Sequence, residues 1–302
     1  MRHTYSSPAK INWFLHITGR RADGYHTLET VFQRIDWCDE IHITPNQDGQ
    51  IYLFNANNDS ANITVTDNLI YRAALALKQH LLEHAVNPEQ TERIEQLGAD
   101  IELHKHIPMG AGLGGGSSDA ATTLIALNEL WQANVDNATL QQIGLTLGAD
   151  VPFFISPYAS ALARGVGEAL TPLTVAPREL LLVKPNVHAD TRSVYQHPLL
   201  VRDHAPLEEG VHDLEKQLQR LDAHAPFAND MQSAAFVIAP EIETVYKTLQ
   251  TIAPQAYVCM SGSGATVFAC PNTTEERAAL AQWQESECPS HWISRWCRTL
   301  GE

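Results

Sequence analysis

A run of glycines constrains the fold of this chain more than any other feature. Five glycines fall within seven positions: Gly110, Gly112, Gly114, Gly115 and Gly116. Glycine lacks a Cβ, so such a loop can adopt positive φ values and bring backbone N–H groups close to a ligand. Alternating residues predict a strand over 99–106, and apolar spacing predicts a helix over 117–131. Because a helix N-terminus favours anions, the order strand, glycine loop, helix predicts a phosphate-binding loop.

The spacing of the glycines matches one other pattern, and two further phosphate motifs are absent. Gly110-x-Gly112-x-x-Gly115 satisfies the dinucleotide fingerprint, which is a weak signal alone. A Rossmann unit would next need a strand ending in an acidic residue about 20 positions later, whereas the residues after Val135 predict another helix. The Walker A lysine and the His-Arg-Asp and Asp-Phe-Gly motifs of protein kinases do not occur. A dinucleotide-dependent oxidoreductase therefore stays open as the less favoured alternative, and NAD(P) binding would support it.

The composition is that of a globular protein. The 302 residues are 44% hydrophobic and 18% charged, which suits two modest domains or one large one. Residues 1–9 contain no apolar segment typical of a signal peptide, and no apolar run is long enough to span a bilayer. The five cysteines are scattered without a Cys-x-x-Cys pair. These features predict a cytoplasmic protein with reduced thiols and no membrane partner.

The net charge bears on the ligands. With histidines neutral the chain carries −15, which disfavours nucleic acid as a partner because nucleic acid requires a basic surface. An anionic ligand must therefore be attracted locally, against the field of the whole protein. Helix dipoles, a few basic side chains and a bound Mg²⁺ ion are the expected sources of that attraction.

The remaining pattern predicts mixed strands and helices in two domains, 1–157 and 158–302, with the boundary near Ser156-Pro157. In the first domain we expect a strand at 9–17, a strand pair at 40–45 and 50–55 around the turn Asp48-Gly49, a helix at 68–84, a polar surface excursion at 87–98 and a helix at 138–147. In the second we expect strands at 160–164, 180–184 and 292–297, helices at 213–221, 241–252 and 274–284, and a strand pair at 256–260 and 265–269 around a second glycine turn.

Two histidine patterns could be read as metal sites. His80-Leu-Leu-Glu-His84 spells a zinc-peptidase signature, and on a helix the two histidines share a face. That face lies beside Leu77 and Leu81, so packing explains the histidines and we expect no zinc chemistry there. His104 and His106 alternate on one strand face, and we expect exposed strand residues there rather than ligands.

Three further segments gain meaning from the phosphate loop. Lys10 and Asn12 are two residues apart, on the same face of a strand. A polar turn at 19–26 presents Tyr25 and His26, and the segment 147–154 is expected to bury Asp150 among apolar neighbours. Each of these residues alone has an ordinary structural explanation. Their occurrence together with a phosphate loop favours a catalytic site.

The motifs together resemble the GHMP kinase superfamily, which includes galactose, homoserine and mevalonate kinases. The resemblance extends over nearly the whole chain. The matching segments are Pro8-Ala-Lys-Ile-Asn12, Gly19-Arg-Arg-Ala-Asp-Gly-Tyr-His26, Ile107-Pro-Met-Gly-Ala-Gly-Leu-Gly-Gly-Gly-Ser-Ser-Asp-Ala-Ala121, Gly148-Ala-Asp-Val-Pro-Phe153, Asn229-Asp230 and Met260-Ser-Gly-Ser-Gly-Ala-Thr-Val-Phe268. The run ending at His26 is the most specific of them, and it is similar to the branch that acts on a cytidyl diphosphate sugar alcohol.

The resemblance implies a fold and an activity. The fold is α/β (α+β), with a ribosomal-S5-like N-terminal domain, a ferredoxin-like C-terminal domain and an active site between them. ATP, with Mg²⁺, would give its γ-phosphoryl group to the 2-hydroxyl of the methylerythritol part of the small-molecule substrate. The protein would act as a monomer or a homodimer.

The resemblance also implies residue roles, by motif match. Lys10 and Asp150 take the catalytic positions, and Asn12, Tyr25, His26 and Tyr195 take substrate positions, with Tyr25 and Tyr195 stacking on the two sides of the base. The ATP loop comprises Pro108, Met109, Gly110, Ala111, Gly112, Leu113, Gly114, Gly115, Gly116, Ser117 and Ser118. The Mg²⁺ ligands stay unassigned, with the Ser118 hydroxyl as one candidate.

Two readings within the same fold remain open. A kinase for a small alcohol such as homoserine or mevalonate would need no aromatic side chains to stack on a base, so Tyr25, His26 and Tyr195 argue against it. A non-catalytic binding module is disfavoured by the presence of both Lys10 and Asp150.

Overall fold

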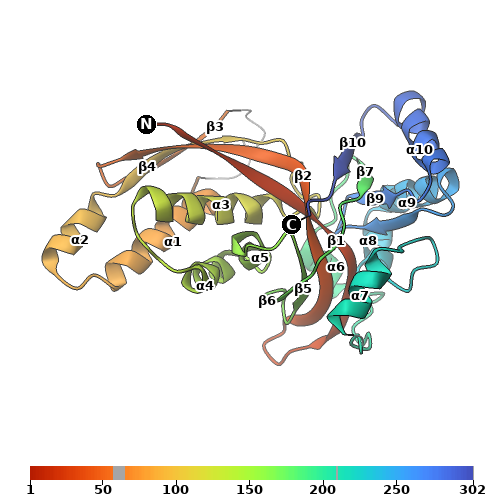
Figure 1. Cartoon of the computed structure of the whole chain (residues 1–302), viewed down its shortest axis with the longest axis horizontal. Helices are drawn as coiled ribbons and strands as arrows, with labels where there is room; N and C mark the ends of the chain where they lie inside the picture. Colours follow the sequence, from red (N-terminus) through yellow and green to blue (C-terminus); the bar gives the residue numbers. More distant parts are fainter. Residues whose placement is uncertain (57–64, 209, 302) are drawn as a thin grey trace. The chain divides into compact units, whose positions relative to one another are not determined.

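The computed structural model describes residues 1–56, 65–208 and 210–301 (Figure 1). The chain falls into two compact units. The first unit comprises Met1–Ala9, Trp37–Met109 and Gly114–Pro157, and the second comprises Lys10–Asp36, Gly110–Leu113 and Tyr158–Glu302. The chain thus changes unit within two long strands, β1 (His3–Arg20) and β2 (His26–Asn46), and within the glycine loop.

The first unit pairs a small sheet with a layer of helices. Its further elements are β3 (Ile51–Asn55), a 3-10 turn (Val65–Asp67), α1 (Leu69–Glu83), α2 (Pro88–Glu95), β4 (Gly98–His104), α3 (Gly115–Leu130), α4 (Asn137–Leu147) and α5 (Val151–Ile155). The strand order is β3-β4-β2, with β1 also paired to β2. Burial alternates along the second part of β2 and along most of β4, so Ile41 and Leu103 are buried while the residues next to them are half-exposed. Figure 1 shows α1 and α3 lying along one face of these strands.

The sequence accounts for the helices of the first unit. The Asn68 side chain accepts a hydrogen bond from the Ile70 amide and begins α1, which buries Ile70, Ala73, Ala74 and Leu77 at helical spacing. The Asp136 carboxylate caps α4 in the same way by accepting from the Thr139 amide. α3 instead begins after Gly114 in the left-handed region, without a side-chain cap. Its first turn is thereby left open.

The second unit contains two sheet regions. Its further elements are β5 (Ser160–Arg164), β6 (Ala169–Pro172), β7 (Glu179–Lys184), α6 (Thr191–Gln196), α7 (Val211–Leu218), α8 (Gln232–Ile238), α9 (Pro240–Ile252), β8 (Tyr257–Met260), β9 (Val267–Cys270), α10 (Thr274–Ser286) and β10 (Ile293–Arg298). The first part of β2 pairs antiparallel with β5, which pairs with β6. A separate antiparallel sheet has the order β10-β7-β9-β8.

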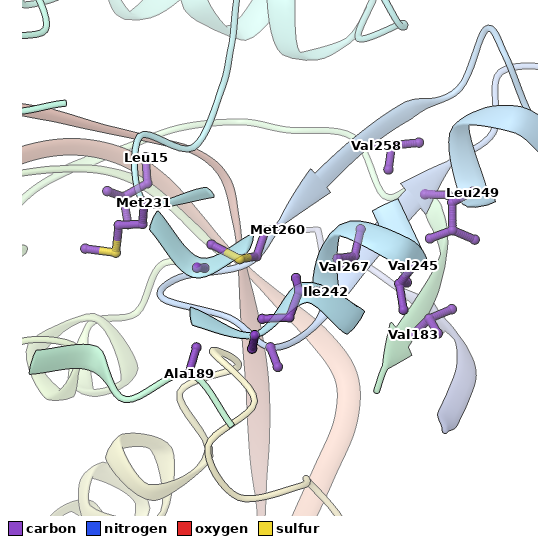
Figure 2. Close-up of a cluster of buried hydrophobic side chains, with 14 of the residues drawn as sticks. Leu15, Val183, Ala189, Met231, Ile242, Val245, Leu249, Val258, Met260 and Val267 are labelled. Atoms are coloured by element: carbon purple, nitrogen blue, oxygen red, sulfur yellow. The ribbon is translucent and has the colours of Figure 1, made fainter. Parts of the chain in front are cut away.

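Apolar side chains from the separate sheet and from α8 and α9 form the core of the second unit (Figure 2). Ile242, Val245 and Leu249 recur at helical spacing on α9 and are fully buried against residues of β7, β8 and β9 such as Val183 and Val267. The predicted strand pair around the second glycine turn is confirmed, since β8 and β9 are antiparallel neighbours.

One expectation about the first unit was wrong. The strands at 40–45 and 50–55 do not pair with each other, because β4 lies between them: it is antiparallel to β2 and parallel to β3. The turn at Asp48-Gly49 therefore leads across a strand and is not a hairpin. The polar segment 87–98 lies mostly at the surface, as expected, and within it the structure adds α2, whose start is capped by the Asn87 side chain and whose single buried residue is Ile94.

Candidate active site

The first half of the glycine loop, Gly110–Leu113, is held by the second unit through its carbonyl groups. The Ala111 oxygen accepts from the Thr266 amide at 3.2 Å, and the Leu113 oxygen accepts from the Lys10 amide at 2.9 Å. The Gly112 oxygen accepts from the Ser261 hydroxyl at 2.9 Å. Since these carbonyls are engaged within the protein, an anion would meet this half of the loop through its N–H groups.

Two positions in this half favour glycine because of positive φ angles and close contacts. Gly112 has φ +73°, and a Cβ there would lie 2.1 Å from the Ser261 carbonyl oxygen. Gly110 has φ +60°, and a Cβ there would lie 2.5 Å from Nδ1 of His188. A side chain at Gly112 would meet backbone, and one at Gly110 would have to displace the His188 ring, so glycine at these positions allows the close packing of the loop.

The second half of the loop forms the N-terminus of α3 in the first unit. The first turn of α3, which is described in full, contains no acidic residue, so its unpaired N–H groups can attract an anion. Ser117 is half-buried, whereas Ser118 is fully buried and its hydroxyl accepts a hydrogen bond from Ser7 at 2.8 Å. Of the two residues, only Ser117 is partly exposed, which argues against Ser118 as a Mg²⁺ ligand.

A buried ionic cluster supports this second half. The Lys105 ammonium lies between the carboxylates of Asp39 and Asp119, 2.8 Å from the latter. Asp39 also accepts the amides of His106 and Ile107 at 2.6 and 2.8 Å. Burial raises the pKa of Asp119 to about 6 in spite of the adjacent ammonium. Sequence reasoning missed this cluster, because Asp39 lies on β2, far along the chain from the loop and at no motif spacing.

Lys10 and Asn12 lie side by side in the second unit, as their spacing predicted. The Lys10 ammonium donates to the Asn12 side-chain oxygen at 2.6 Å and lies 5.0 Å from the centre of the Phe32 ring. The Asn12 amide group donates to the Thr30 hydroxyl at 2.8 Å. Both side chains are buried, with exposed fractions of 3% and 1%. Asn12 thus orients Lys10, and any contact of Asn12 with a substrate would compete with these bonds.

Asn229 holds the second glycine turn. Its side-chain amide donates to the carbonyls of Met260 and Gly262, both at 2.7 Å, and its oxygen accepts the Met231 amide at 2.9 Å. The neighbouring Ser261 is the residue that binds Gly112. The motif Asn229-Asp230 was visible in the sequence, but only the structure gives this positioning role.

Asp150 lies at the start of α5 in the first unit and is half-buried, not buried as expected. The five residues of α5 that follow it are all buried, so the apolar pattern belongs to the helix and not to the surroundings of the carboxylate. A Cβ on Gly148 would lie 3.6 Å from the Ser117 hydroxyl. The segment before Asp150 therefore packs against the N-terminus of α3.

The aromatic residues of the second unit form a partly preformed surface. The rings of His26 and Tyr195 are stacked, with centroids 5.0 Å apart and planes 19° apart. Tyr25 is 67% exposed. The Nε2 atom of His26 is buried and has no hydrogen-bond partner within the described part of the chain. Burial, followed by the positive charges of Arg202 and Arg20, lowers the pKa of His26. The site therefore combines stacking surfaces, an unused imidazole nitrogen and positive charge.

Comparison with known proteins adds independent information. The family models for the GHMP kinases N terminal domain and the GHMP kinases C terminal match residues 68–157 and 202–288. A 4-diphosphocytidyl-2-C-methyl-D-erythritol kinase of Paraburkholderia phytofirmans is 43% identical over 288 residues, covering 95% of this chain and 90% of the relative. The chain belongs to the GHMP kinase family.

Other members agree with this assignment. The relative of the same name from Paraburkholderia xenovorans is 42% identical and covers 98% of this chain and 93% of its own length. A crystal structure of 4-(cytidine 5'-diphospho)-2C-methyl-D-erythritol kinase has a TM-score of 0.74 and 32% identity, covering 99% of this chain and 100% of its own. A homoserine kinase from Cytophaga hutchinsonii is 15% identical, covers 99% of this chain and 95% of its own, and with a TM-score of 0.70 shares the fold. The two-domain α/β GHMP kinase fold expected from the sequence is confirmed.

None of the helices within 1–56, 65–208 and 210–301 is both long and apolar enough to cross a membrane. All five cysteines have free thiols.

Proposed function

We propose that this GHMP kinase transfers the γ-phosphoryl group of ATP to the 2-hydroxyl of 4-diphosphocytidyl-2-C-methyl-D-erythritol, a step of the non-mevalonate isoprenoid precursor pathway. The observation that carries the proposal is the 43% identity, over 95% of the chain, to a relative that bears this kinase's name. The stacked pair of His26 and Tyr195 supports the choice of a substrate with a base. Kinases for small alcohols share the fold at 15% identity or less, which supports no choice of substrate.

The glycine loop would bind the phosphates of ATP. Its first half presents N–H groups because its carbonyls are engaged, and its second half adds the N-terminus of α3. This local attraction is needed because the chain carries a net charge of −15. A bound Mg²⁺ ion would neutralise phosphate charge, and the hydroxyl of the partly exposed Ser117 is the candidate ligand that this half of the loop offers.

Lys10 and Asp150 would act on the reacting groups. Phosphoryl transfer passes through a loose transition state, so positioning and electrostatics dominate its catalysis. Asp150 would accept the proton of the attacking hydroxyl, a contribution worth about 10²- to 10⁴-fold in rate. Lys10, held in place by Asn12, would stabilise the charge that develops on the transferred group.

The aromatic residues would select the cytidyl group. Tyr25 and Tyr195 would stack on the base, each contact being worth about 1–3 kcal/mol. The unpartnered Nε2 atom of His26 could hydrogen-bond an edge of the base, which would end the isolation of that nitrogen. Since Tyr195 stacks on His26 in the structure, the base would have to displace or extend this stack. Arg20 and Arg202, whose charges act on His26, would favour the diphosphate.

The first experiment compares acceptor alcohols. ADP release is measured with Mg-ATP and, in separate reactions, the cytidyl compound, homoserine and mevalonate. The proposal predicts turnover with the cytidyl compound alone. Turnover with another alcohol would support a kinase activity but show that the substrate is a different one. ATP binding without turnover of any acceptor would favour a binding module, and NAD(P) binding would favour the oxidoreductase.

The second experiment tests the base. Asp150→Asn should lower kcat at least 10²-fold while the Kd for ATP stays nearly unchanged. The matched control is Asp136→Asn, the same change at a carboxylate that only caps α4. An Asp150→Asn protein that keeps most of its kcat would remove Asp150 from the role of base.

A further inference from the structure

Four polar side chains form a square on the first unit, on the half-exposed face of β2 and β4. In the antiparallel register Glu40 lies opposite His104, and His42 lies opposite Glu102. Acid and imidazole therefore alternate both along and across the strands. The alternate residues, such as Ile41 and Leu103, are buried on the other face, and Figure 1 shows α1 and α3 along one face of these strands. The square is thus directed away from the core of the first unit.

Three of the four side chains converge on one point. Glu40, His42 and His104 each offer a ligand atom, and these atoms all lie within 4.8 Å of one another. Nε2 of His42 is 2.6 Å from the Glu40 carboxylate. The two imidazole rings meet edge to face, with centroids 4.8 Å apart and planes at 80°. Ligand atoms around a tetrahedral ion with bonds of about 2.1 Å lie about 3.4 Å apart, so small side-chain rotations would complete the geometry.

The outer nitrogens of both histidines are already held. Nδ1 of His42 lies 2.9 Å from the Thr4 hydroxyl, which leaves Nε2 for a ligand role. Nε2 of His104 lies 2.9 Å from the Glu102 carboxylate, which leaves Nδ1, and Arg2 in turn holds Glu102 at 3.0 Å. Histidines that bind metals in proteins show this arrangement, in which an oxygen accepts from the second ring nitrogen and orients the ring.

We propose that Glu40, His42 and His104 bind a divalent transition-metal ion, with Zn²⁺ as the reference ion. Two imidazoles and one carboxylate form a common zinc donor set, and three protein ligands leave a fourth position for water. Mg²⁺ and Ca²⁺ prefer oxygen ligands, so this site is separate in chemistry from the magnesium that accompanies ATP. The ion links β2 to β4, the strand that leads to the glycine loop. The inference reverses the expectation that His104 is only an exposed strand residue.

The chain offers a competing pair of histidines that serves as an internal control. His80 and His84 lie on and just after α1, with ring centroids 4.2 Å apart. However, Nδ1 of His84 lies 2.8 Å from the His80 carbonyl oxygen, and no carboxylate of the described residues joins this pair in a three-ligand cluster. Binding at the square and binding at this pair can therefore be told apart by substitution.

The test is a Zn²⁺ titration of the full-length protein after treatment with a chelator, followed by calorimetry. We expect one ion per chain, and a loss of affinity of at least tenfold in His42→Ala and in His104→Ala, with the His80→Ala control unchanged. Zn²⁺ should raise the melting temperature of the wild type by a few degrees and not that of the His42→Ala protein. Unchanged binding in a protein that carries both His42→Ala and His104→Ala, or binding lost only in His80→Ala, would overturn the proposal.

A second measurement avoids substitution altogether. In the wild-type protein, the ring nitrogens of His42 and His104 should shift in NMR spectra on addition of one equivalent of Zn²⁺. Shifts confined to other histidines would contradict the assignment, as would an absence of any shift at millimolar Zn²⁺.

Discussion

The two halves of the glycine loop are held by different chemistry. Gly110–Leu113 rests on neutral hydrogen bonds from Ser261 and from backbone amides. The half that begins α3 is supported by the buried charges of Lys105, Asp39 and Asp119. Neutral hydrogen bonds add no charge, so the electrostatic potential at the first half of the loop comes mainly from its own N–H groups. At the second half, a buried cation between two carboxylates fixes the segment without adding net positive charge nearby.

The same contrast extends to buried titratable groups. The first unit buries Asp119 beside a cation, and its pKa rises to about 6. The second unit buries His16, whose pKa falls to about 4 because burial and then the charge of His204 disfavour the imidazolium. Neither ring nitrogen of His16 has a hydrogen-bond partner among the described residues. The buried charge at Asp119 is therefore compensated by a neighbouring ion, while His16 is kept neutral.

Removal of the buried Lys105 charge should have the largest effect on stability. Lys105→Met leaves two carboxylates buried without a counterion, so the free energy of unfolding should fall by about 3–5 kcal/mol in urea denaturation at neutral pH. Acidification should reduce the loss, because a protonated Asp119 carries no charge. The control is Lys247→Met, an exposed lysine paired with Glu243 on α9, which should change stability by less than about 0.5 kcal/mol. If the two substitutions lowered the free energy of unfolding equally, the buried charges would not be the special support described for the second half of the loop.

The burial of the His16 imidazole predicts that the free energy of unfolding changes with pH by up to about 3 kcal/mol. The unfolded chain binds a proton at His16 near pH 6.5 but the folded chain only near pH 4. Stability contributed by this group should therefore be complete above about pH 6.5 and fall as the pH drops towards 4. Denaturation across this range should show a flatter curve for His16→Gln than for wild type. An unchanged slope would mean that His16 titrates normally.

A substitution at Gly112, where the loop packs closely on Ser261, should lower the free energy of unfolding by less than Lys105→Met does. Gly112→Ala places a methyl group 2.1 Å from the Ser261 carbonyl and keeps a positive φ, so we expect a loss of about 1–3 kcal/mol in unfolding free energy. Gly116→Ala is the control, because its nearest atom would be Leu69 Cδ1 at 3.5 Å and the position is helical. It should leave the protein as stable or slightly more stable. A reversed order of the two would contradict the packing described here.

Loss of the Ser261 hydroxyl should have the smallest effect on stability. Ser261→Ala removes the hydrogen bond that the hydroxyl donates to the Gly112 carbonyl and the longer one, 3.3 Å, that it accepts from the Asn12 amide. A hydrogen bond of good geometry contributes about 0.5–1.5 kcal/mol. Ser263→Ala, which removes an exposed bond to Thr191, should change thermal stability less. A loss at Ser261 as large as that at Lys105 would show that the first half of the loop depends on more than neutral bonds.

Sequence spacing predicted those site residues that lie close together along the chain. The glycine run, and Lys10 with Asn12 two residues on, could be found because strand and helix periodicity places them without knowledge of the fold. Asp39 could not, since it acts on a segment distant in sequence and has no spacing signal of its own. Asn229 was visible as part of a motif, but its hold on the second glycine turn could not be predicted from spacing. The turn at Asp48-Gly49 misled for the same reason, because a later strand, β4, inserts beside β2.

Composition identified 87–98 as a polar surface segment but did not reveal its helix. α2 buries only Ile94, so it has little apolar periodicity, and its cap at Asn87 was the signal that could have identified it. The apolar residues after Asp150 are the buried face of α5 and say nothing of how deeply the carboxylate itself lies.

The most direct test of the proposed activity is the identity of the product. The protein is incubated with Mg-ATP and 4-diphosphocytidyl-2-C-methyl-D-erythritol, and the product is examined by ³¹P NMR. The carbon that bears the 2-hydroxyl carries a methyl group and no hydrogen, so the account predicts a new phosphomonoester signal without three-bond coupling to hydrogen. A new signal that is split by such coupling would place the phosphate on another hydroxyl, and no new signal with ATP bound would contradict the proposed kinase activity.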